Sequence, residues 1–196
     1  MTDVLAAVRA HLSAHFGTEP DAASVTFLGT QSFEVLRFGP DDRPGLEGVI
    51  HYVSLGCSRE PMTDPAELAA DPVRGPRAEV MVSLRGTTPT GLARSVAVLA
   101  AAPAVEGLML APDALVDLGT PLWSGAPFTA FLLGRSEIGD VELLAPSGPV
   151  VVLSATPITA TEAAWVRLKG AEAMREAWRT DGVDVLDPAR RASSPT

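Results

Sequence analysis

The chain has 196 residues, of which 46% are hydrophobic and 20% charged. This composition excludes a wholly disordered protein and suits one domain with a buried core. With 24 acidic and 15 basic residues the formal net charge is −9, so the chain lacks the excess of basic residues that nucleic-acid binding requires. A basic protein is a more suitable partner for such a chain than a nucleic acid. Its single cysteine, Cys57, excludes an intrachain disulfide and any cysteine-rich metal site.

A helix is predicted at the start of the chain, from Asp3 to Phe16, because apolar residues recur there at helical spacing. Thr2 is expected to cap this helix and Gly17 to end it. The residues that follow, 19–23, are expected to form a loop. Alternating apolar and polar side chains then predict three strands, the first two paired as a hairpin, at 25–28, 33–38 and 48–55.

The middle of the chain opens with a segment, 59–76, that holds four prolines and several acids and is therefore predicted to be a long exposed loop. A strand is predicted at 78–84. A mostly apolar helix, Leu92–Ala102, follows it, with Thr90 as a plausible cap. Further strands are predicted at 128–133, 141–144 and 150–153.

The clearest local signal lies near the end of the chain. Thr159 and Glu162 have the spacing of a capping box, in which each side chain accepts a hydrogen bond from a free backbone N–H at the other residue. The helix that starts here is expected to bend or break at Gly170, to continue through Met174 and to stop near Gly182.

Residues 1–187 are expected to form a single domain, since no linker or repeat divides them. The tail, 188–196, lacks apolar anchors and is expected to be mobile. No secretory signal is visible, and the longest apolar stretch, 95–105, is too short to cross a bilayer and contains Pro103. These features predict a cytoplasmic protein that does not contact membranes.

Catalytic motifs with a nucleophile or a phosphate-binding loop are not found in the sequence. The nearest candidate nucleophiles are Cys57 and Ser58, at the expected end of a strand. His51 is the nearest base, but strand alternation places it on the opposite sheet face from Tyr52, and an extended chain does not bring it back to Cys57. A packed, unreactive thiol is therefore favoured, and a hydrolase using Cys57 or Ser58 is the alternative.

Two histidines, His11 and His15, lie four residues apart on the first predicted helix, which is the spacing of paired metal ligands. The glutamate of the usual zinc-binding helix does not follow His11, and no third ligand can be named. Surface histidines are therefore favoured, and a small-ligand or metal-binding module is a further alternative. We predict neither a metal nor a cofactor.

Acidic side chains are spaced irregularly along the predicted loop. Their spacing favours a solvated loop, and the alternative is an electronegative docking surface for a protein partner. The four acids are Glu60, Asp64, Glu67 and Asp71.

Three separated segments carry a family resemblance: 51–62 (HYVSLGCSREPM), 77–84 (RAEVMVSL) and 157–174, the last followed by Asp187-Pro-Ala-Arg190. In this order they resemble the Suppressor of fused family, in which a strand runs into a Gly-x-Ser turn and an Asp-x-x-Arg element closes the domain. Cys57 departs from the family, where Met or Leu is commoner at this position. The proline-rich loop is a second departure, so the family's conformation there is not carried over.

The resemblance implies an α/β (α+β) fold with a mixed, largely antiparallel central sheet and flanking helices. It also implies a binding domain rather than an enzyme. Bacterial single-domain relatives look like immunity proteins that occlude a toxin, and the charge of −9 suits a basic toxin as partner. A sheet edge is a second expected docking surface, where a partner segment adds as a strand.

The family motif in this chain comprises Tyr52, Ser54, Gly56, Ser58 and Glu79. Gly56 permits a turn that other residues do not, and Ser54 and Ser58 can bond nearby backbone groups. The favoured interpretation is that the motif builds the turn that orders the fold. Direct contact with a partner is the alternative.

Overall fold

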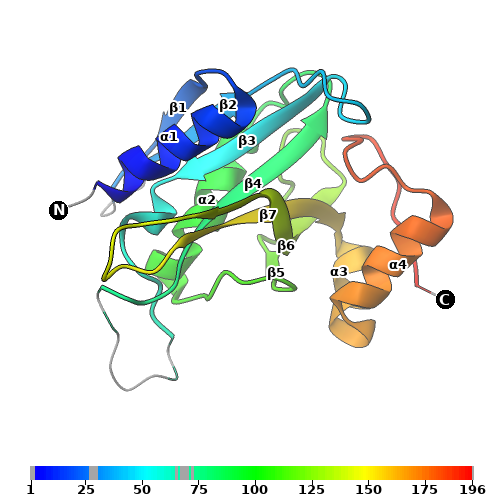
Figure 1. The fold of residues 1–196 in the computed structure, drawn as a ribbon. Helices are drawn as coiled ribbons and strands as arrows, with labels where there is room; N and C mark the ends of the chain where they lie inside the picture. The colour runs from blue at the N-terminus through cyan, green and yellow to red at the C-terminus, as the bar shows by residue number, and fades with distance from the viewer. Residues whose placement is uncertain (1–2, 27–30, 65, 67–70, 72, 196) are drawn as a thin grey trace.

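The computed structural model describes residues 3–26, 31–64, 66, 71 and 73–195. In this part of the chain a single seven-stranded sheet is covered by helices on both faces (Figure 1). In chain order the elements are α1 (Val4–Phe16), β1 (Asp21–Val25), β2 (Phe33–Phe38), β3 (Val49–Leu55), a 3-10 turn (Cys57–Arg59), β4 (Arg77–Arg85), α2 (Leu92–Glu106), β5 (Leu115–Asp117), β6 (Phe128–Val141), β7 (Val150–Thr159), α3 (Ala160–Lys169) and α4 (Ala171–Asp181).

The strands lie in the order β1-β2-β3-β4-β7-β6-β5, so β1 and β5 are the two edges of the sheet. All neighbouring pairs are antiparallel except β4 and β7, which run parallel with Arg77 opposite Val150. The segment that connects these two parallel strands contains α2, β5 and β6. The expected α/β (α+β) fold, with a mixed and largely antiparallel sheet, is therefore confirmed.

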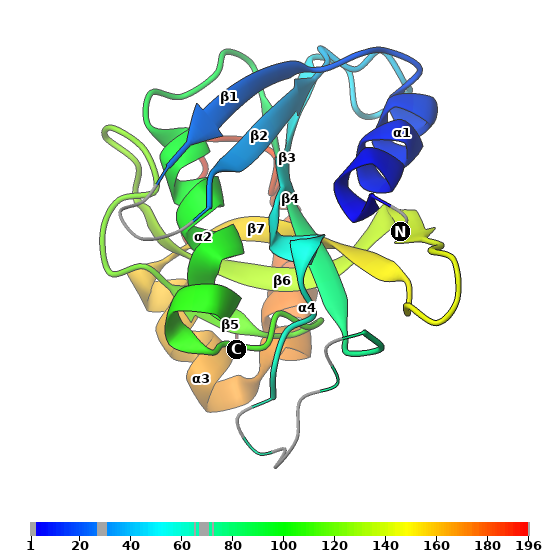
Figure 2. The same ribbon diagram turned by 90° about the vertical axis from the view of Figure 1, so that its left-hand side faces the viewer.

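Two helices cover opposite faces of the sheet (Figure 2). The apolar side of α1 buries Val8 and Leu12 against Leu36 and Phe38 of β2. On the other face α2 packs into the largest apolar cluster, which includes Tyr52. Because strand side chains alternate between faces, each central strand contributes to both clusters, and nearly all of its residues are buried.

Helices α3 and α4 cover the β6–β7 end of the sheet. Ala130 and Leu132 of β6 face this pair, where they meet Met174 and Trp178, whereas Phe131 between them faces α2. The capping box predicted at the start of α3 is confirmed, and Gly170 separates α3 from α4, also as expected.

Helix boundaries differ from the prediction in two places. The N-cap of α1 is Asp3, whose carboxylate accepts the N–H groups of Leu5 and Ala6; the expected cap, Thr2, lies outside the described residues. The N-cap of α2 is Gly91 rather than Thr90, and the helix continues past Pro103 to Glu106. Pro103 has no N–H to donate to the carbonyl of Leu99, and the helix runs only three residues beyond it.

Strand boundaries differ more. The expected loop 19–23 overlaps β1, which is an exposed edge strand paired with β2 and shows no alternation of apolar and polar residues. Of the expected strand 25–28, residues 27–28 lie outside the described residues. Strand β5 was not predicted, because three residues between turns carry no periodicity. The strand predicted at 141–144 is wrong beyond Val141, which ends the long strand β6, and β7 extends to Thr159. No helix in the described part of the chain is both long and apolar enough to span a bilayer.

Candidate functional site

The family motif surrounds one buried carboxylate, that of Glu79 on β4. Oε1 accepts hydrogen bonds from the backbone N–H of Gly56 (2.9 Å), and from the N–H (3.0 Å) and hydroxyl (2.6 Å) of Ser58. Oε2 accepts the hydroxyl of Ser54 at 2.5 Å, and that hydroxyl oxygen in turn accepts the N–H of Val80. The carboxylate thus holds the turn after β3 against β4.

Gly56 is required at this turn for two reasons. Its φ of 145° is a conformation that other residues rarely adopt, and a Cβ here would lie 3.0 Å from the ring of Phe33. Arg77 secures the far side of the turn, because its Nη1 donates to the carbonyl oxygens of Ser58 and Arg59 at 2.8 Å each.

Burial limits what the motif can do. Ser54, Ser58 and Glu79 are each 0% exposed, and burial raises the pKa of Glu79, although its hydrogen bonds from Ser54 and Ser58 partly offset this effect. Tyr52 is not part of this network. Its side chain packs in the apolar cluster on the α2 face of the sheet, and its hydroxyl donates a hydrogen bond to Thr88. The arrangement supports the interpretation that the motif builds the turn. A partner could not touch it without displacing the surrounding core.

The candidate nucleophiles Cys57 and Ser58 lie in this same buried turn. Burial raises the pKa of the Cys57 thiol well above its usual value, and the nearby charge of Glu79 adds to the effect. The Ser58 hydroxyl does lie against a carboxylate, but both groups are fully buried and line none of the three best-formed pockets in the described part of the chain. His51 instead hydrogen-bonds Asp41 (2.9 Å) and Ser83 (2.8 Å) and packs against Phe16 of α1. This geometry gives the hydrolase alternative no support.

The two helix histidines do not act as a pair. The Nε2 of His11 lies 3.2 Å from the carbonyl oxygen of Ile138, while the ring of His15 packs edge-on against Phe16. Among the described residues, no group of three or more His, Cys, Asp and Glu side chains could hold a metal ion. The metal-module alternative therefore has no ligand set in this part of the chain.

The acidic loop is only partly described, and Glu67 lies outside the described residues. Glu60 and Asp71 are exposed to solvent, and Asp64 is partly exposed. Asp71 accepts the N–H groups of Val73 and Arg74, and these bonds lower its pKa. Asp64 likewise accepts the N–H of Ala66. Two of the four acids thus stabilise local turns, and their role as a docking surface stays a prediction.

A second buried polar cluster, which was not predicted from the sequence, centres on Glu162. Besides closing the capping box, its carboxylate accepts hydrogen bonds from Trp178 Nε1 (2.9 Å), Arg190 (2.7 and 3.0 Å) and the N–H of Ser193 (3.1 Å). The expectation of a mobile tail considered only apolar anchors, whereas residues 190 and 193 are held here by polar contacts. The Asp187-x-x-Arg190 element was the signal that could have found this cluster.

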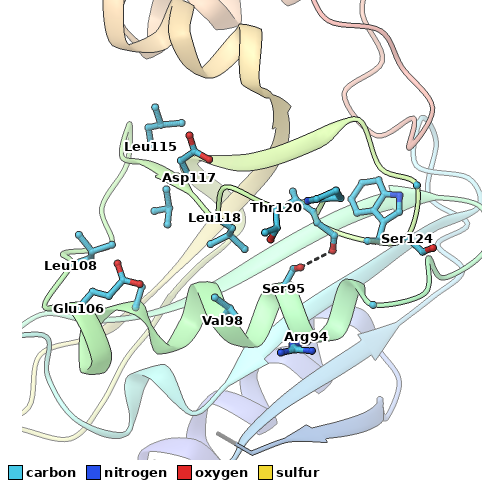
Figure 3. A pocket seen from close by; sticks show the side chains of 17 residues that line it. Arg94, Ser95, Val98, Glu106, Leu108, Leu115, Asp117, Leu118, Thr120 and Ser124 are labelled. Atoms are coloured by element: carbon cyan, nitrogen blue, oxygen red, sulfur yellow. Dashed lines mark hydrogen bonds between the residues drawn. The ribbon is translucent and has the colours of Figure 1, made fainter.

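An open groove lies beside the edge strand β5 (Figure 3). Its volume is about 640 Å³, within the range of ligand-sized clefts. One wall is α2, and the other is formed by β5 and the following segment, 118–125. Two hydrogen bonds hold the walls together, from the Ser95 hydroxyl to the Leu122 carbonyl (2.6 Å) and from the Ser124 N–H to the Thr90 carbonyl (2.9 Å).

The lining of the groove is mixed. Val98, Leu115 and Leu118 supply apolar surface, and Leu108, which is 38% exposed, extends it at the end of α2. At that same end lies the acid Glu106, whereas the base Arg94 lies near the start of α2.

A further acid on β5, Asp117, also lines the groove. Its carboxylate pairs with Arg167 of α3 at 2.8 Å, and this bond lowers its pKa. A groove that joins apolar side chains, a few charges and a free sheet edge has the chemistry to hold an extended segment of another protein.

Comparisons with known proteins agree on one family. A family profile described as Suppressor of fused protein (SUFU) matches residues 29–191. A SUFU homolog from Neisseria gonorrhoeae FA 1090 is 20% identical, with a TM-score of 0.67, over 97% of this chain and 96% of that one. A chain in the Sufu-Fu complex is 17% identical with a TM-score of 0.72, over 97% and 92% of the two chains. No curated protein sequence matches.

A longer relative shows the same fold. Drosophila Suppressor of Fused is 16% identical with a TM-score of 0.68, and 97% of this chain matches 51% of that protein. The chain thus spans about half the length of the Drosophila protein. At these identities the likeness concerns the fold alone.

Proposed function

The chain belongs to the Suppressor of fused family, and on that premise we propose that it is a non-catalytic protein-binding domain whose docking surface is the groove between α2 and β5. The observation that carries this proposal is the coincidence of the groove with an edge of the sheet. An edge strand presents unpaired backbone groups, and a groove beside it supplies pockets for the side chains of an added strand.

The β5 edge suits this role better than the β1 edge. Strand β1 is almost entirely exposed, and none of its residues lines any of the three best-formed pockets in the described part of the chain. Strand β5 is short, and the side chains of its own Leu115 and of Leu118, which follows it, line the groove.

The partner is proposed to be a basic protein. The formal charge of −9 accelerates encounter with a positively charged partner, and Glu106 lines the groove as an acid without a described ion pair. One similar structure is that of the Sufu-Fu complex, in which a protein of this fold takes part in an assembly. Occlusion of a basic toxin, as an immunity protein, is the specific role we propose. The free thiol of Cys57 is in keeping with the reducing cytoplasm.

Co-expression with the products of adjacent genes tests this function. We expect one product to co-purify with the chain at low ionic strength and to lose its toxicity in the presence of the chain. Replacing groove side chains by Leu118→Glu and Leu108→Glu should weaken that complex by about 10- to 100-fold, because it places charge in a desolvated contact.

The matched control is Leu168→Glu on α3. Leu168 is 74% exposed and does not line the groove, so this change adds the same charge without altering the complex. If no neighbouring product binds, the immunity role is wrong. If the control weakens the complex as much as the groove variants do, the assignment of the groove is wrong.

A further inference from the structure

A second pocket, of about 710 Å³, lies on the α1 side of the sheet, away from the groove. It forms where the N-terminus of α1, the hairpin between β6 and β7 and the start of β4 meet; Figure 2 shows the first two of these side by side. Its wall is mostly apolar, and two of its side chains, Val73 and Leu144, are 41% and 72% exposed. The larger apolar lining residues are Val4, Leu5, Val73, Leu143, Leu144 and Pro146.

The unusual group in this pocket is the guanidinium of Arg77. The residue is only 6% exposed, yet among the described residues no carboxylate lies within ion-pair distance of it. Nη1 donates to the carbonyl oxygens of Ser58 and Arg59, whereas Nε is buried without a hydrogen-bond partner. Burial lowers the pKa of Arg77, although the more distant charge of Glu60 acts in the opposite direction. An uncompensated buried charge is costly unless something pairs with it.

The guanidinium edge formed by Nε and Nη2 makes no hydrogen bond within the described residues, and its geometry indicates which kind of ligand could bind there. The N–H bonds of Nε and Nη2 lie parallel on one edge, at the spacing that meets both oxygens of a carboxylate. Because Nη1 is already used by the turn, this two-pronged edge is what Arg77 has left to offer. Arg77 is one of the residues that line the pocket, so a ligand in the pocket would lie beside it.

The surrounding charges favour an anion. Arg59 also lines the pocket, as does the N-terminal turn of α1, whose backbone dipole attracts negative charge. The only acid among the described lining residues is Asp3, and its carboxylate is occupied in capping Leu5 and Ala6. The lining thus carries two arginines and one occupied acid, in a chain whose formal charge is −9, and Glu60, which does not line the pocket, also acts on Arg77.

We propose that this pocket binds a carboxylate that is attached to an apolar body. The carboxylate pairs with the edge of Arg77 formed by Nε and Nη2, for which the described residues supply no hydrogen-bond partner. The apolar body lies against the wall formed by α1 and the β6–β7 hairpin. This chemistry is shared by a free medium-chain carboxylic acid and by the C-terminus of a polypeptide that ends in apolar residues.

Calorimetric titration and the Nε–H resonance of Arg77 in ¹⁵N NMR test the proposal. The probes are octanoate, a short apolar peptide with a free C-terminus, and the same peptide amidated. We expect saturable binding of octanoate, of the free-acid peptide, or of both, together with slower solvent exchange and a shift of the Arg77 Nε–H. Octanoate binding alone assigns the site to small acids, and peptide binding alone assigns it to a C-terminus.

Variants separate the site from non-specific binding. Arg77→Lys keeps the positive charge but loses the pair of parallel N–H groups that can bind both carboxylate oxygens, so it should weaken binding about 10-fold or more. Because Arg77 also supports the turn, Leu144→Asp is a second variant at an exposed position, and it should weaken binding similarly. Arg74→Gln removes a neighbouring exposed charge outside the pocket and should leave binding unchanged. Failure of both acids to bind, or equal binding of the amidated peptide, would overturn the proposal.

Discussion

Arg190 and Glu162, 28 residues apart in the chain, form an ion pair whose side chains are 3% and 0% exposed. Nη1 of Arg190 lies 2.7 Å from Oε1 of Glu162, and Nη2 lies 3.0 Å from Oε2. The guanidinium also lies over the rings of Phe128 and Trp178. Although burial acts to raise the pKa of Glu162, the bonds from Arg190 and Thr159 hold it below its usual value. This pair joins the end of the chain to the start of α3.

Removing one partner of this pair should be severely destabilising. Arg190→Met leaves the Glu162 carboxylate buried without its cation, and we expect the free energy of unfolding to fall by about 3–5 kcal/mol. Urea denaturation followed by circular dichroism measures this loss. The neighbouring and exposed Arg191→Met is the control, and it should change stability by less than about 0.5 kcal/mol. Similar small changes in both variants would contradict a stabilising role for the pair.

The capping box at α3 makes a smaller, local contribution. Thr159 accepts the N–H of Glu162 at 3.2 Å, so Thr159→Ala should cost about 0.5–2 kcal/mol of unfolding free energy. Thr161→Ala, two residues on at an exposed position of the same helix, removes the same atoms without removing a cap. If Thr161→Ala lowers the free energy of unfolding as much as Thr159→Ala does, the loss cannot be attributed to the capping hydrogen bond.

Glu79 should make stability depend on pH. Its pKa in the folded state is raised above the unfolded value of about 4.3, so the folded protein holds the proton of Glu79 up to a higher pH than the unfolded chain does. The stability contributed by Glu79 therefore falls as pH rises from about 4.3 through the folded pKa. Glu79→Gln does not titrate, so its stability relative to the parent should rise across this window.

Denaturation at about pH 5 and about pH 8 measures this difference. Glu79→Ala provides the comparison: it also removes the titrating group, so its cost relative to the parent should shrink as pH rises, but it leaves the N–H groups of Gly56 and Ser58 buried and unpaired and should be the less stable of the two variants at both pH values. A Glu79→Gln variant whose stability relative to the parent falls as pH rises would contradict the expected direction.

Cys57 should behave as an inert thiol in the folded protein. It is 9% exposed, and burial raises its pKa, so little reactive thiolate forms at neutral pH. We expect a thiol reagent such as a disulfide dye to react at the rate of unfolding and to react at once in denaturant. Rapid, stoichiometric reaction in native buffer would revive the hypothesis of a nucleophile at this position.

Local patterns predicted the elements whose signals are local. The helix 3–16, the capping box at Thr159 and the central strands were found because apolar spacing and cap chemistry act within a few residues. The edge strands β1 and β5 carry no such signal, because pairing with a distant strand and not periodicity makes them strands.

The polar networks were predicted only in part. The motif around Gly56 was found by resemblance, and Glu79 was named with it, but the convergence of four hydrogen bonds on one carboxylate is a tertiary fact. Arg190 meets Glu162 only after α3 and α4 have folded back on the sheet, so a tail without apolar residues seemed unanchored. The groove likewise depends on how α2 packs against β5.

Hydrogen exchange of the chain alone and in complex with its co-purifying partner tests the protein-binding groove most directly. The account predicts that amides of 115–118 and 120–125 exchange at least about 10-fold more slowly in the complex, while those of β1 (Asp21–Val25) are unchanged. Protection confined to β1, or a complex that leaves residues 115–125 as exposed to exchange as in the free chain, would contradict it.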